Sequence, residues 1–291
     1  MTRADEAEAR TSKDTDVDAP VNYAGDIVGR AGFDVVNPER TNAVFEPHTV
    51  HIRDVRGREV PSLDEGKFAF IKHRSAMAGD PAFFESNLEH QFERTELNGR
   101  YEDELSAFLR DMFDADQVFA QYSGLIARTS SRAKKRSWGD VAGFVHSDFT
   151  EKSANQFLGW SRDANGFEHK PYSRFMLMQT WRVVSPAPQD TPLAICDSRT
   201  VPPEDTVLFD TRLGPEDQPG NFFEARFCKY RASHEWYYLS DMEPDDVLLF
   251  TGFDSADPLG ANAMHSAFDN PHGQDGPPRQ SIEARFFVLW Y

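Results

Sequence analysis

Residues 143–150, GFVHSDFT, place a histidine and an aspartate two positions apart, His146 and Asp148. In an extended chain successive side chains point to opposite faces, so these two side chains share one face. An imidazole nitrogen and a carboxylate oxygen on the same face can occupy two neighbouring positions of one metal ion. The segment therefore predicts two ligands of a metal site.

A third ligand has to come from elsewhere in the chain, and His265 is the best candidate among the nine histidines. It lies in an alternating segment, residues 262–269, that can form a strand beside the one carrying His146. Two histidines and one carboxylate are the facial set of non-haem Fe(II) oxygenases, which leaves three metal positions open. A zinc hydrolase can use a similar set, although the sequence contains no H-E-x-x-H motif. His48 and His51 form a weaker pair, because a spacing of three splits them between faces.

The open metal positions call for a co-substrate, and the C-terminal segment offers a residue to bind it. Arg279 begins the strand that follows His265, and Ser281 lies on the same face. A guanidinium binds a carboxylate through two hydrogen bonds, which suits the distal carboxylate of 2-oxoglutarate. Arg285 competes for this role but lies roughly 20 Å farther along the strand. We prefer Arg279, since it is nearer the turn from His265, and expect Glu283 to pair with Arg285.

Composition excludes several classes of protein. The chain has 291 residues and a net charge of −17, which argues against a nucleic-acid partner because phosphate contacts require a basic face. Mean hydropathy is −0.60, and no apolar run approaches the roughly 20 residues that span a bilayer, so we expect no membrane partner. Two cysteines, Cys196 and Cys228, are too few for a disulfide scaffold and favour a reducing cytoplasm. The sequence does not indicate an oligomeric state.

The chain reads as one domain, residues 21–291, behind a disordered acidic leader, residues 1–20. The segments after residue 115 alternate apolar and polar residues between Pro, Gly and Asp turns, which is typical of a β-sandwich or barrel. One long strand is expected over 114–131 and one helix over 152–164. Residues 99–113 predict a second helix with an apolar face, made of Leu105, Phe108, Leu109, Met112 and Phe113.

The last strand has two unlike faces. Arg279, Ser281, Glu283 and Arg285 alternate with apolar residues, among them Phe286. Solvent exposure explains such a polar face, and so does a polar cavity inside a barrel whose apolar outer face is covered by helices.

Four stretches taken together resemble the AsaB/CmcJ-like hydroxylase/desaturase family. They are VHSDFT, QTWRVVSPAPQDTPLAICDSRTV, EWYYLSDMEPDDVLLFTGFDS, and MHSAFDNP with PPRQSIEARFFV. The resemblance covers roughly residues 115–291. It implies a mainly β fold with flanking helices and a double-stranded β-helix (jelly-roll, cupin-like) core over those residues. It also implies an Fe(II)/2-oxoglutarate-dependent oxygenase that uses O2, with His146, Asp148 and His265 on the iron and with Arg279 and Ser281 on 2-oxoglutarate.

The chain departs from the family pattern at Gln179, where Asn is usual before the Trp, and we expect Gln179 to donate to the co-substrate. The family implies hydroxylation, desaturation or oxidative cyclisation at an unactivated C–H bond. The substrate class it implies is a small secondary metabolite or amino-acid-like molecule. Alternatives are a metal-dependent hydrolase or isomerase on a cupin-like barrel, and a non-catalytic β-barrel binding protein. Candidate residues for contact with the substrate are Tyr122, Arg128, Trp181, Arg182 and Phe268.

Overall fold

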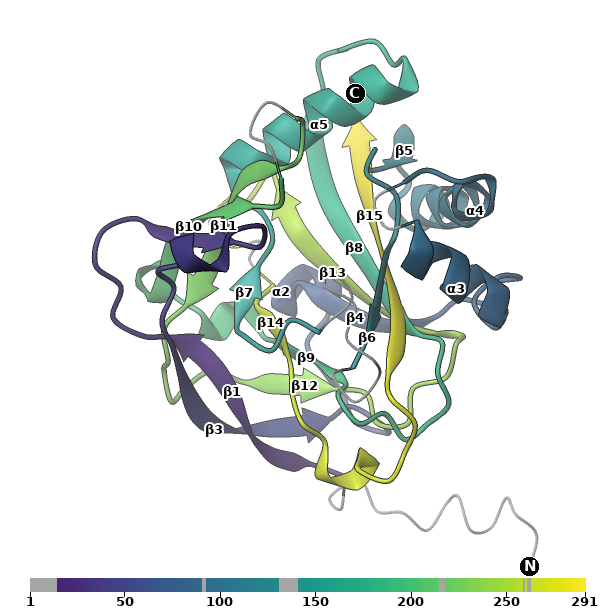
Figure 1. Ribbon diagram of the computed structural model, residues 1–291. Helices are drawn as coiled ribbons and strands as arrows, with labels where there is room; N and C mark the ends of the chain where they lie inside the picture. The colour runs from purple at the N-terminus through teal and green to yellow at the C-terminus, as the bar shows by residue number, and fades with distance from the viewer. Residues whose placement is uncertain (1–14, 91–92, 131–140, 215–217, 259, 261–262) are drawn as a thin grey trace, which may run out of the picture.

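Two β-sheets face each other (Figure 1). The computed structural model describes residues 15–90, 93–130, 141–214, 218–258, 260 and 263–291. The larger sheet has nine strands in the order β1-β3-β12-β9-β14-β7-β11-β10-β2. They are β1 (Val17–Ala24), β2 (Ala31–Asp34), β3 (Phe45–Asp54), β7 (His146–Ser147), β9 (Leu193–Cys196), β10 (Thr206–Arg212), β11 (Phe222–Cys228), β12 (Trp236–Tyr238) and β14 (His265–Ala267).

The smaller sheet has the order β4-β13-β8-β15-β5, and β6 also pairs with β15. Its strands are β4 (Phe68–Lys72), β5 (Gln117–Ala120), β6 (Ile126–Thr129), β8 (Arg174–Val183), β13 (Asp246–Asp254) and β15 (Gln280–Trp290). The helices are α2 (Leu63–Gly66), α3 (Pro81–Glu89), α4 (Glu96–Phe113) and α5 (Glu151–Asn165), with short 3-10 turns at Pro38–Arg40, Ser198–Thr200, Pro203–Asp205 and Pro271–Gly273.

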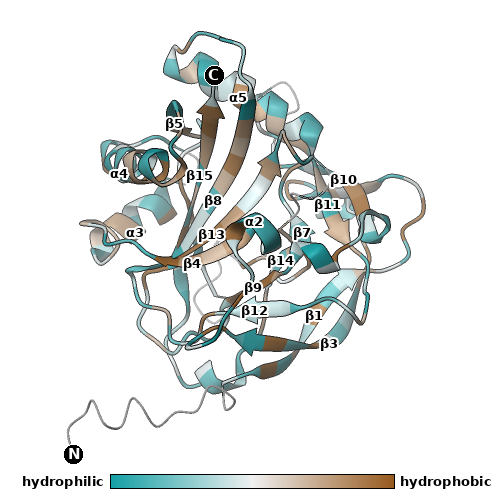
Figure 2. Cartoon of the chain, turned by 180° about the vertical axis from the view of Figure 1, so that it is seen from behind, coloured by the Kyte–Doolittle hydropathy of each residue, from teal (hydrophilic) through white to brown (hydrophobic). Residues whose placement is uncertain are grey.

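Apolar side chains fill the space between the sheets and the space behind the smaller one. One cluster joins Phe175 and Phe287 of the smaller sheet to Phe227 of the larger sheet. A second cluster packs β15 against α3 and α4, which cover the outer face of the smaller sheet. Seen from behind, the strands of this sheet carry much of the strongly hydrophobic colouring (Figure 2). One apolar cluster therefore lies between the two sheets, and a second lies between the smaller sheet and its helices.

Strand β15 confirms the prediction of two unlike faces. Phe286 and its apolar neighbours belong to the cluster beneath α3 and α4. Arg279 and Glu283 line one pocket between the sheets, and Arg285 lines another. The polar face thus points into the interior of the molecule, as expected of a barrel with helices outside.

The predicted mainly β fold with flanking helices is confirmed, with local corrections. Strand β1 begins at Val17, so the expected leader is too long at its C-terminal end, and residues 1–14 lie outside the described part. The single strand expected over 114–131 is two strands, β5 and β6, with a turn at Gly124, whose φ is +70°. Helix α4 starts earlier than predicted because Thr95 caps it, accepting a hydrogen bond from the Asn98 backbone N–H.

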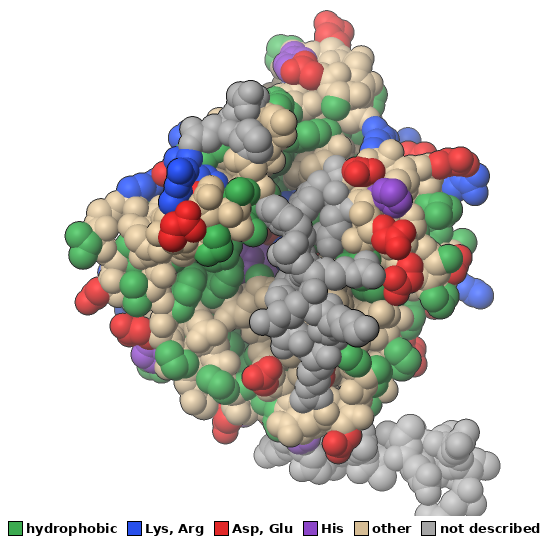
Figure 3. Space-filling model, viewed as in Figure 1, with side chains coloured by type: hydrophobic (Ala, Val, Ile, Leu, Met, Phe, Trp, Pro, Cys, Tyr) green, Lys and Arg blue, Asp and Glu red, His purple; other side chains and the backbone are tan. Residues whose placement is uncertain are grey.

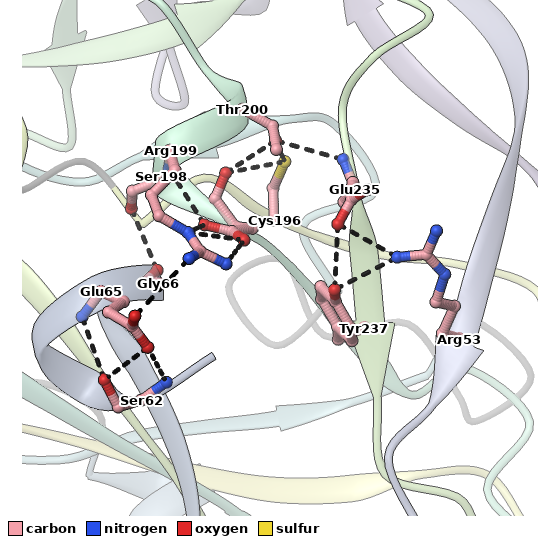
Figure 4. Close-up of polar contacts among 11 residues, drawn as sticks. Arg53, Ser62, Glu65, Gly66, Cys196, Ser198, Arg199, Thr200, Glu235 and Tyr237 are labelled. Atoms are coloured by element: carbon pink, nitrogen blue, oxygen red, sulfur yellow. Dashed lines mark hydrogen bonds and ion pairs between the residues drawn. The ribbon is translucent and has the colours of Figure 1, made fainter. Parts of the chain in front are cut away.

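Both cysteines are buried and free. Figure 4 shows Cys196 beside Thr200, within a polar network that ties Arg199 to Glu65 and Tyr237 to Arg53. Burial, the main cause, raises the pKa of the Cys196 thiol to about 12. A thiol held neutral in this way is a packing residue and a poor nucleophile. Among the described residues, no helix has the length and apolar character needed to cross a membrane.

Candidate metal centre and its two pockets

His146 and His265 lie directly opposite each other on neighbouring strands. Strand β7 pairs with β14 in antiparallel register, with His265 facing His146, and the two ring centroids are 4.3 Å apart. Asp148 follows β7, and its Oδ1 lies 3.7 Å from His146 Nε2, while Oδ2 lies 3.8 Å from His265 Nε2. The structure thus brings the three predicted ligands together, with one ligand atom of each within 4.8 Å of the others.

Backbone carbonyls set the orientation of both imidazoles. His146 Nδ1 lies 2.9 Å from the Phe144 carbonyl oxygen, and His265 Nδ1 lies 3.0 Å from that of Ala263. Because a carbonyl only accepts, each Nδ1 carries the proton and each Nε2 presents a lone pair to the centre. This is the arrangement that metal-binding histidines adopt.

Asp148 is fixed by residues of the smaller sheet. Its Oδ2 accepts hydrogen bonds from Gln179 Nε2 at 2.6 Å and from Arg285 Nη2 at 3.2 Å. Glu283 Oε1 in turn accepts from Gln179 and from Arg285 Nε. The expected Glu283–Arg285 pair therefore forms. Gln179 donates here to Asp148 and Glu283, and its expected contact with a co-substrate stays a prediction.

The electrostatics of the centre favour ligation. Burial, and after it the charge of His265, lowers the pKa of His146 to about 3, so the ring is neutral. Burial by itself would raise the pKa of Asp148, but the charge of Arg285 and the hydrogen bond from Gln179 oppose it, and that pKa lies below its usual range. A neutral imidazole and an ionised carboxylate are the forms that bind a metal.

A small inner pocket continues from the centre to Arg279. It is narrow, with a cavity volume of about 20 Å³, and is lined by His146, Asp148, His265, Trp181, Arg128 and Arg279, among others. Arg279 is only 1% exposed, donates from Nη1 to the Thr191 carbonyl and lies over the Trp181 ring. Its Nε has no hydrogen-bond partner among the described residues. Burial, and then the charge of Arg128, lowers the pKa of Arg279 to about 9. A buried cation beside a second cation is a site that an anion would stabilise.

A larger apolar pocket meets the inner pocket at Arg128, His146 and Asp148. Its cavity volume is about 240 Å³, and it is lined largely by Phe33, Ile126, Phe144, Phe209, Leu213 and Phe223. Figure 3, which has the same view as Figure 1, shows a hollow near the middle of the molecule with hydrophobic side chains beside it. The metal centre therefore lies where a polar cavity and an apolar cavity join.

The structure places three of the five expected substrate residues away from both pockets. Arg182 and Trp181 are neighbours on β8, so they face opposite ways, and Arg182 donates to the His73 and Pro244 carbonyls beneath the helices. Tyr122 stacks on Phe157. Phe268 packs edge-on against Tyr238 in the core of the larger sheet. Arg128 and Trp181 do line the pockets.

Sequence reasoning missed the wall of the apolar pocket and one glycine. The wall comes from β2, β10 and β11, whose alternating residues, such as Phe209 and Phe223, carry a strand signal but no chemical motif. A Cβ on Gly252 would lie 2.6 Å from Gln179 Oε1 and 2.9 Å from the Phe149 ring. Gly252 thus leaves the space in which Gln179 reaches Asp148.

Comparison with known proteins agrees with this geometry. A family model described as an oxidoreductase/YMDC permease-like domain matches residues 12–289. The hydroxylase/desaturase CTB9 of Cercospora beticola is 27% identical over 264 residues, which cover 84% of this chain and 78% of that relative. The Fe(II)/2-oxoglutarate-dependent dioxygenase nvfI of Aspergillus novofumigatus is 28% identical over 258 residues, 87% of each chain. The resemblance to hydroxylase/desaturase proteins is therefore confirmed.

A solved structure shares the fold. The iron and alpha-ketoglutarate-dependent endoperoxidase NvfI matches with a TM-score of 0.76 over 95% of this chain and 98% of that chain, at 23% sequence identity. This likeness confirms the jelly-roll type of core expected from the sequence.

Proposed function

We propose, from the premise that this chain belongs to the oxidoreductase/YMDC permease-like family, that it is an Fe(II)- and 2-oxoglutarate-dependent oxygenase. It oxidises an unactivated C–H bond of a small molecule with O2, by hydroxylation, desaturation or oxidative cyclisation. The observation that carries the proposal is the convergence of two imidazole Nε2 atoms and one carboxylate at the junction of two pockets.

The residues present fit a divalent iron. His146, Asp148 and His265 supply two nitrogen donors and one oxygen donor, the facial set that leaves positions open for other ligands. Iron bound there supplies the oxidative chemistry with O2 and 2-oxoglutarate, which no side chain of the protein provides. The chain itself holds the ligands, binds the co-substrate and shapes the pocket around the reacting carbon.

Arg279 is the proposed anchor of the distal carboxylate of 2-oxoglutarate. It lies in the inner pocket with the metal ligands, and its buried guanidinium forms no direct ion pair with a carboxylate among the described residues. Arg285 is a poor anchor because it already donates to Asp148 and Glu283. Ser281 is buried two residues beyond Arg279, and we assign it as the second donor to the co-substrate. Arg128 and Trp181 complete the proposed lining of the co-substrate site.

Anaerobic titration with Fe(II) and 2-oxoglutarate tests the proposal. Chelation of iron by the keto acid gives a weak visible charge-transfer band, and O2 then converts 2-oxoglutarate to succinate. We expect the band in the wild type, its loss in Asp148→Ala, and its retention in Asp163→Ala, which changes an exposed aspartate on α5. Arg279→Met should weaken 2-oxoglutarate binding while Fe(II) binding persists.

A band that persists unchanged in Asp148→Ala would show that the ligand assignment is wrong. Hydrolytic turnover with zinc, without any band or succinate, would favour the hydrolase class instead. Retained binding of a small molecule without metal or turnover would favour a binding protein.

We also propose that β1 to β15 form a single domain and that the protein works in the cytoplasm. Both ends of the chain build the two facing sheets, since β1 pairs with β3 of the larger sheet and β15 is central to the smaller one. The cytoplasmic location rests on the two free, buried thiols.

A further inference from the structure

Among the described residues that line the apolar pocket, one polar side chain lies away from the metal end and is not used by the proposed chemistry. Thr211 on β10 lines this pocket, is 6% exposed, and lies among Phe33, Phe209, Leu213 and Phe223. Its Oγ1 has no hydrogen-bond partner among the residues that the structure describes. By contrast, the polar groups at the metal end, such as Asp148 and Arg285, are bound to one another.

An unpaired hydroxyl in such a wall is energetically unfavourable. A buried donor without a partner loses its hydrogen bonds to water and gains nothing in return. Valine has the same shape as threonine and would fill this position without that loss. The hydroxyl is covered in the structure, but one staggered rotation about χ1 exchanges it with the methyl group or the hydrogen on Cβ. A bound molecule that offers an oxygen at this wall would satisfy it.

We propose that Thr211 binds an oxygen atom of the substrate, and that the substrate is a largely apolar molecule carrying that oxygen far from the reacting carbon. The inference rests on the proposed function, because the metal centre defines where the reacting carbon lies. Of the two substrate classes expected from the sequence, it selects the apolar, oxygen-bearing metabolite. An amino-acid-like zwitterion would lose its hydration against a wall of phenylalanines without gaining a partner for both charges.

Strand register gives the length of this molecule. Phe227 of β11 lies opposite His146, and Phe223 of the same strand lies opposite Thr211. The four steps along β11 from Phe223 to Phe227 span roughly 13 Å at about 3.3 Å per residue. A ligand that reaches from Thr211 to the metal centre is therefore about 10 Å long, the size of a molecule with two to four rings.

A double-mutant cycle between protein and probe tests the contact. The probes are 4-hydroxybiphenyl and 4-methylbiphenyl, which differ by one hydroxyl in place of a methyl group. Their dissociation constants are measured by fluorescence with the wild type, Thr211→Val, Thr211→Ser and Thr206→Val, all loaded with Fe(II) and 2-oxoglutarate under anaerobic conditions. Thr206 lies at the exposed start of the same strand and donates to the Pro203 carbonyl, so it is the matched control.

We expect the wild type to prefer the hydroxyl probe over the methyl probe by about three- to ten-fold, the effect of one hydrogen bond. Thr211→Val should abolish this preference, while Thr211→Ser and Thr206→Val should keep it. Thermal unfolding of Thr211→Val should match or exceed the wild type, since the unpaired hydroxyl is gone. An equal probe ratio in wild type and Thr211→Val would overturn the proposal, as would failure of both probes to bind.

The charge-transfer band separates this proposal from the proposed function. It should be the same in the wild type and in Thr211→Val, because Thr211 does not line the inner pocket. Loss of the band in the wild type would defeat the oxygenase assignment, whereas an unchanged probe ratio with an intact band would defeat only the role of Thr211.

Discussion

Asp148 has two carboxylate oxygens with different environments. Oδ2 accepts the hydrogen bonds from Gln179 and Arg285, whereas Oδ1 is the oxygen nearest to His146 Nε2. The two donors therefore fix the carboxylate plane, and Oδ1 is left to bind a metal through one oxygen. Positioning of this kind explains why residues behind a metal ligand affect metal affinity.

Replacing Gln179 with leucine removes a donor to Asp148 while keeping a side chain of similar size. We expect Fe(II) affinity to fall by about 10- to 100-fold, the usual effect of losing such a supporting contact. Thr180→Val is the control, since Thr180 lies on the opposite face of β8 and donates to the Ala284 carbonyl. Anaerobic Fe(II) titration measures both variants. Equal affinity in Gln179→Leu and the wild type would mean that Arg285 alone fixes the carboxylate.

Two short strands, β7 and β14, carry the two histidines of the metal centre. The period of two placed His146 and Asp148 on one face, and the alternation around His265 predicted its strand, so the sequence predicted the three residues that the structure brings together. The polar face of β15 was found in the same way. Arg182 lies away from the pockets because residue type alone does not tell which face of a sheet points inward, and Tyr122 lies in the turn between β5 and β6. The wall from β2 and β10 was missed because it depends on pairing between distant segments.

Gly252 on β13 shows how one element makes room for another. Strand register shifts between Thr251 and Phe253, and Gly252 faces the Gln179 side chain across this irregularity. A methyl group there would contact both Gln179 Oε1 and the Phe149 ring. Because Gln179 ends in a flexible amide, the amide is the group that would move.

Gly252→Ala is therefore expected to weaken Fe(II) binding as well as stability. Overpacking in a core costs about 1–3 kcal/mol, and displacement of Gln179 should reproduce part of the loss seen in Gln179→Leu. Gly159→Ala on α5 is the control, because a Cβ there meets nothing within 4 Å and alanine favours a helix. Urea unfolding and Fe(II) titration are the two measurements. Unchanged iron affinity in a destabilised Gly252→Ala would show that Gln179 keeps its position despite the added methyl group.

At the scale of the whole molecule, charged side chains are buried at several places, and two of these places bear on metal binding and on stability. The first is the metal centre, where carboxylates and guanidinium groups pair between the sheets. The second is helix α4, where Glu102 is 2% exposed and contacts Arg94 at 3.3 Å. A protein with a net charge of −17 has many carboxylates, but most of them are solvated. Glu102 is thus a group through which the stability of the whole fold depends on pH.

Burial, the main cause, raises the pKa of Glu102 to about 7, against the opposing effect of Arg94. Between its ordinary value of 4.5 and about 7, the folded protein holds a proton that the unfolded chain has released. The free energy of unfolding therefore falls as pH rises through this window, by an amount on the order of 3 kcal/mol, and becomes level above it. Glu102→Gln carries no such proton, so its stability relative to the wild type should increase between pH 5 and 8. Glu96→Gln, at an exposed position of the same helix, should show no such trend. Urea unfolding at both pH values measures the difference, and parallel curves for Glu102→Gln and the wild type would show that Glu102 is ionised throughout the range.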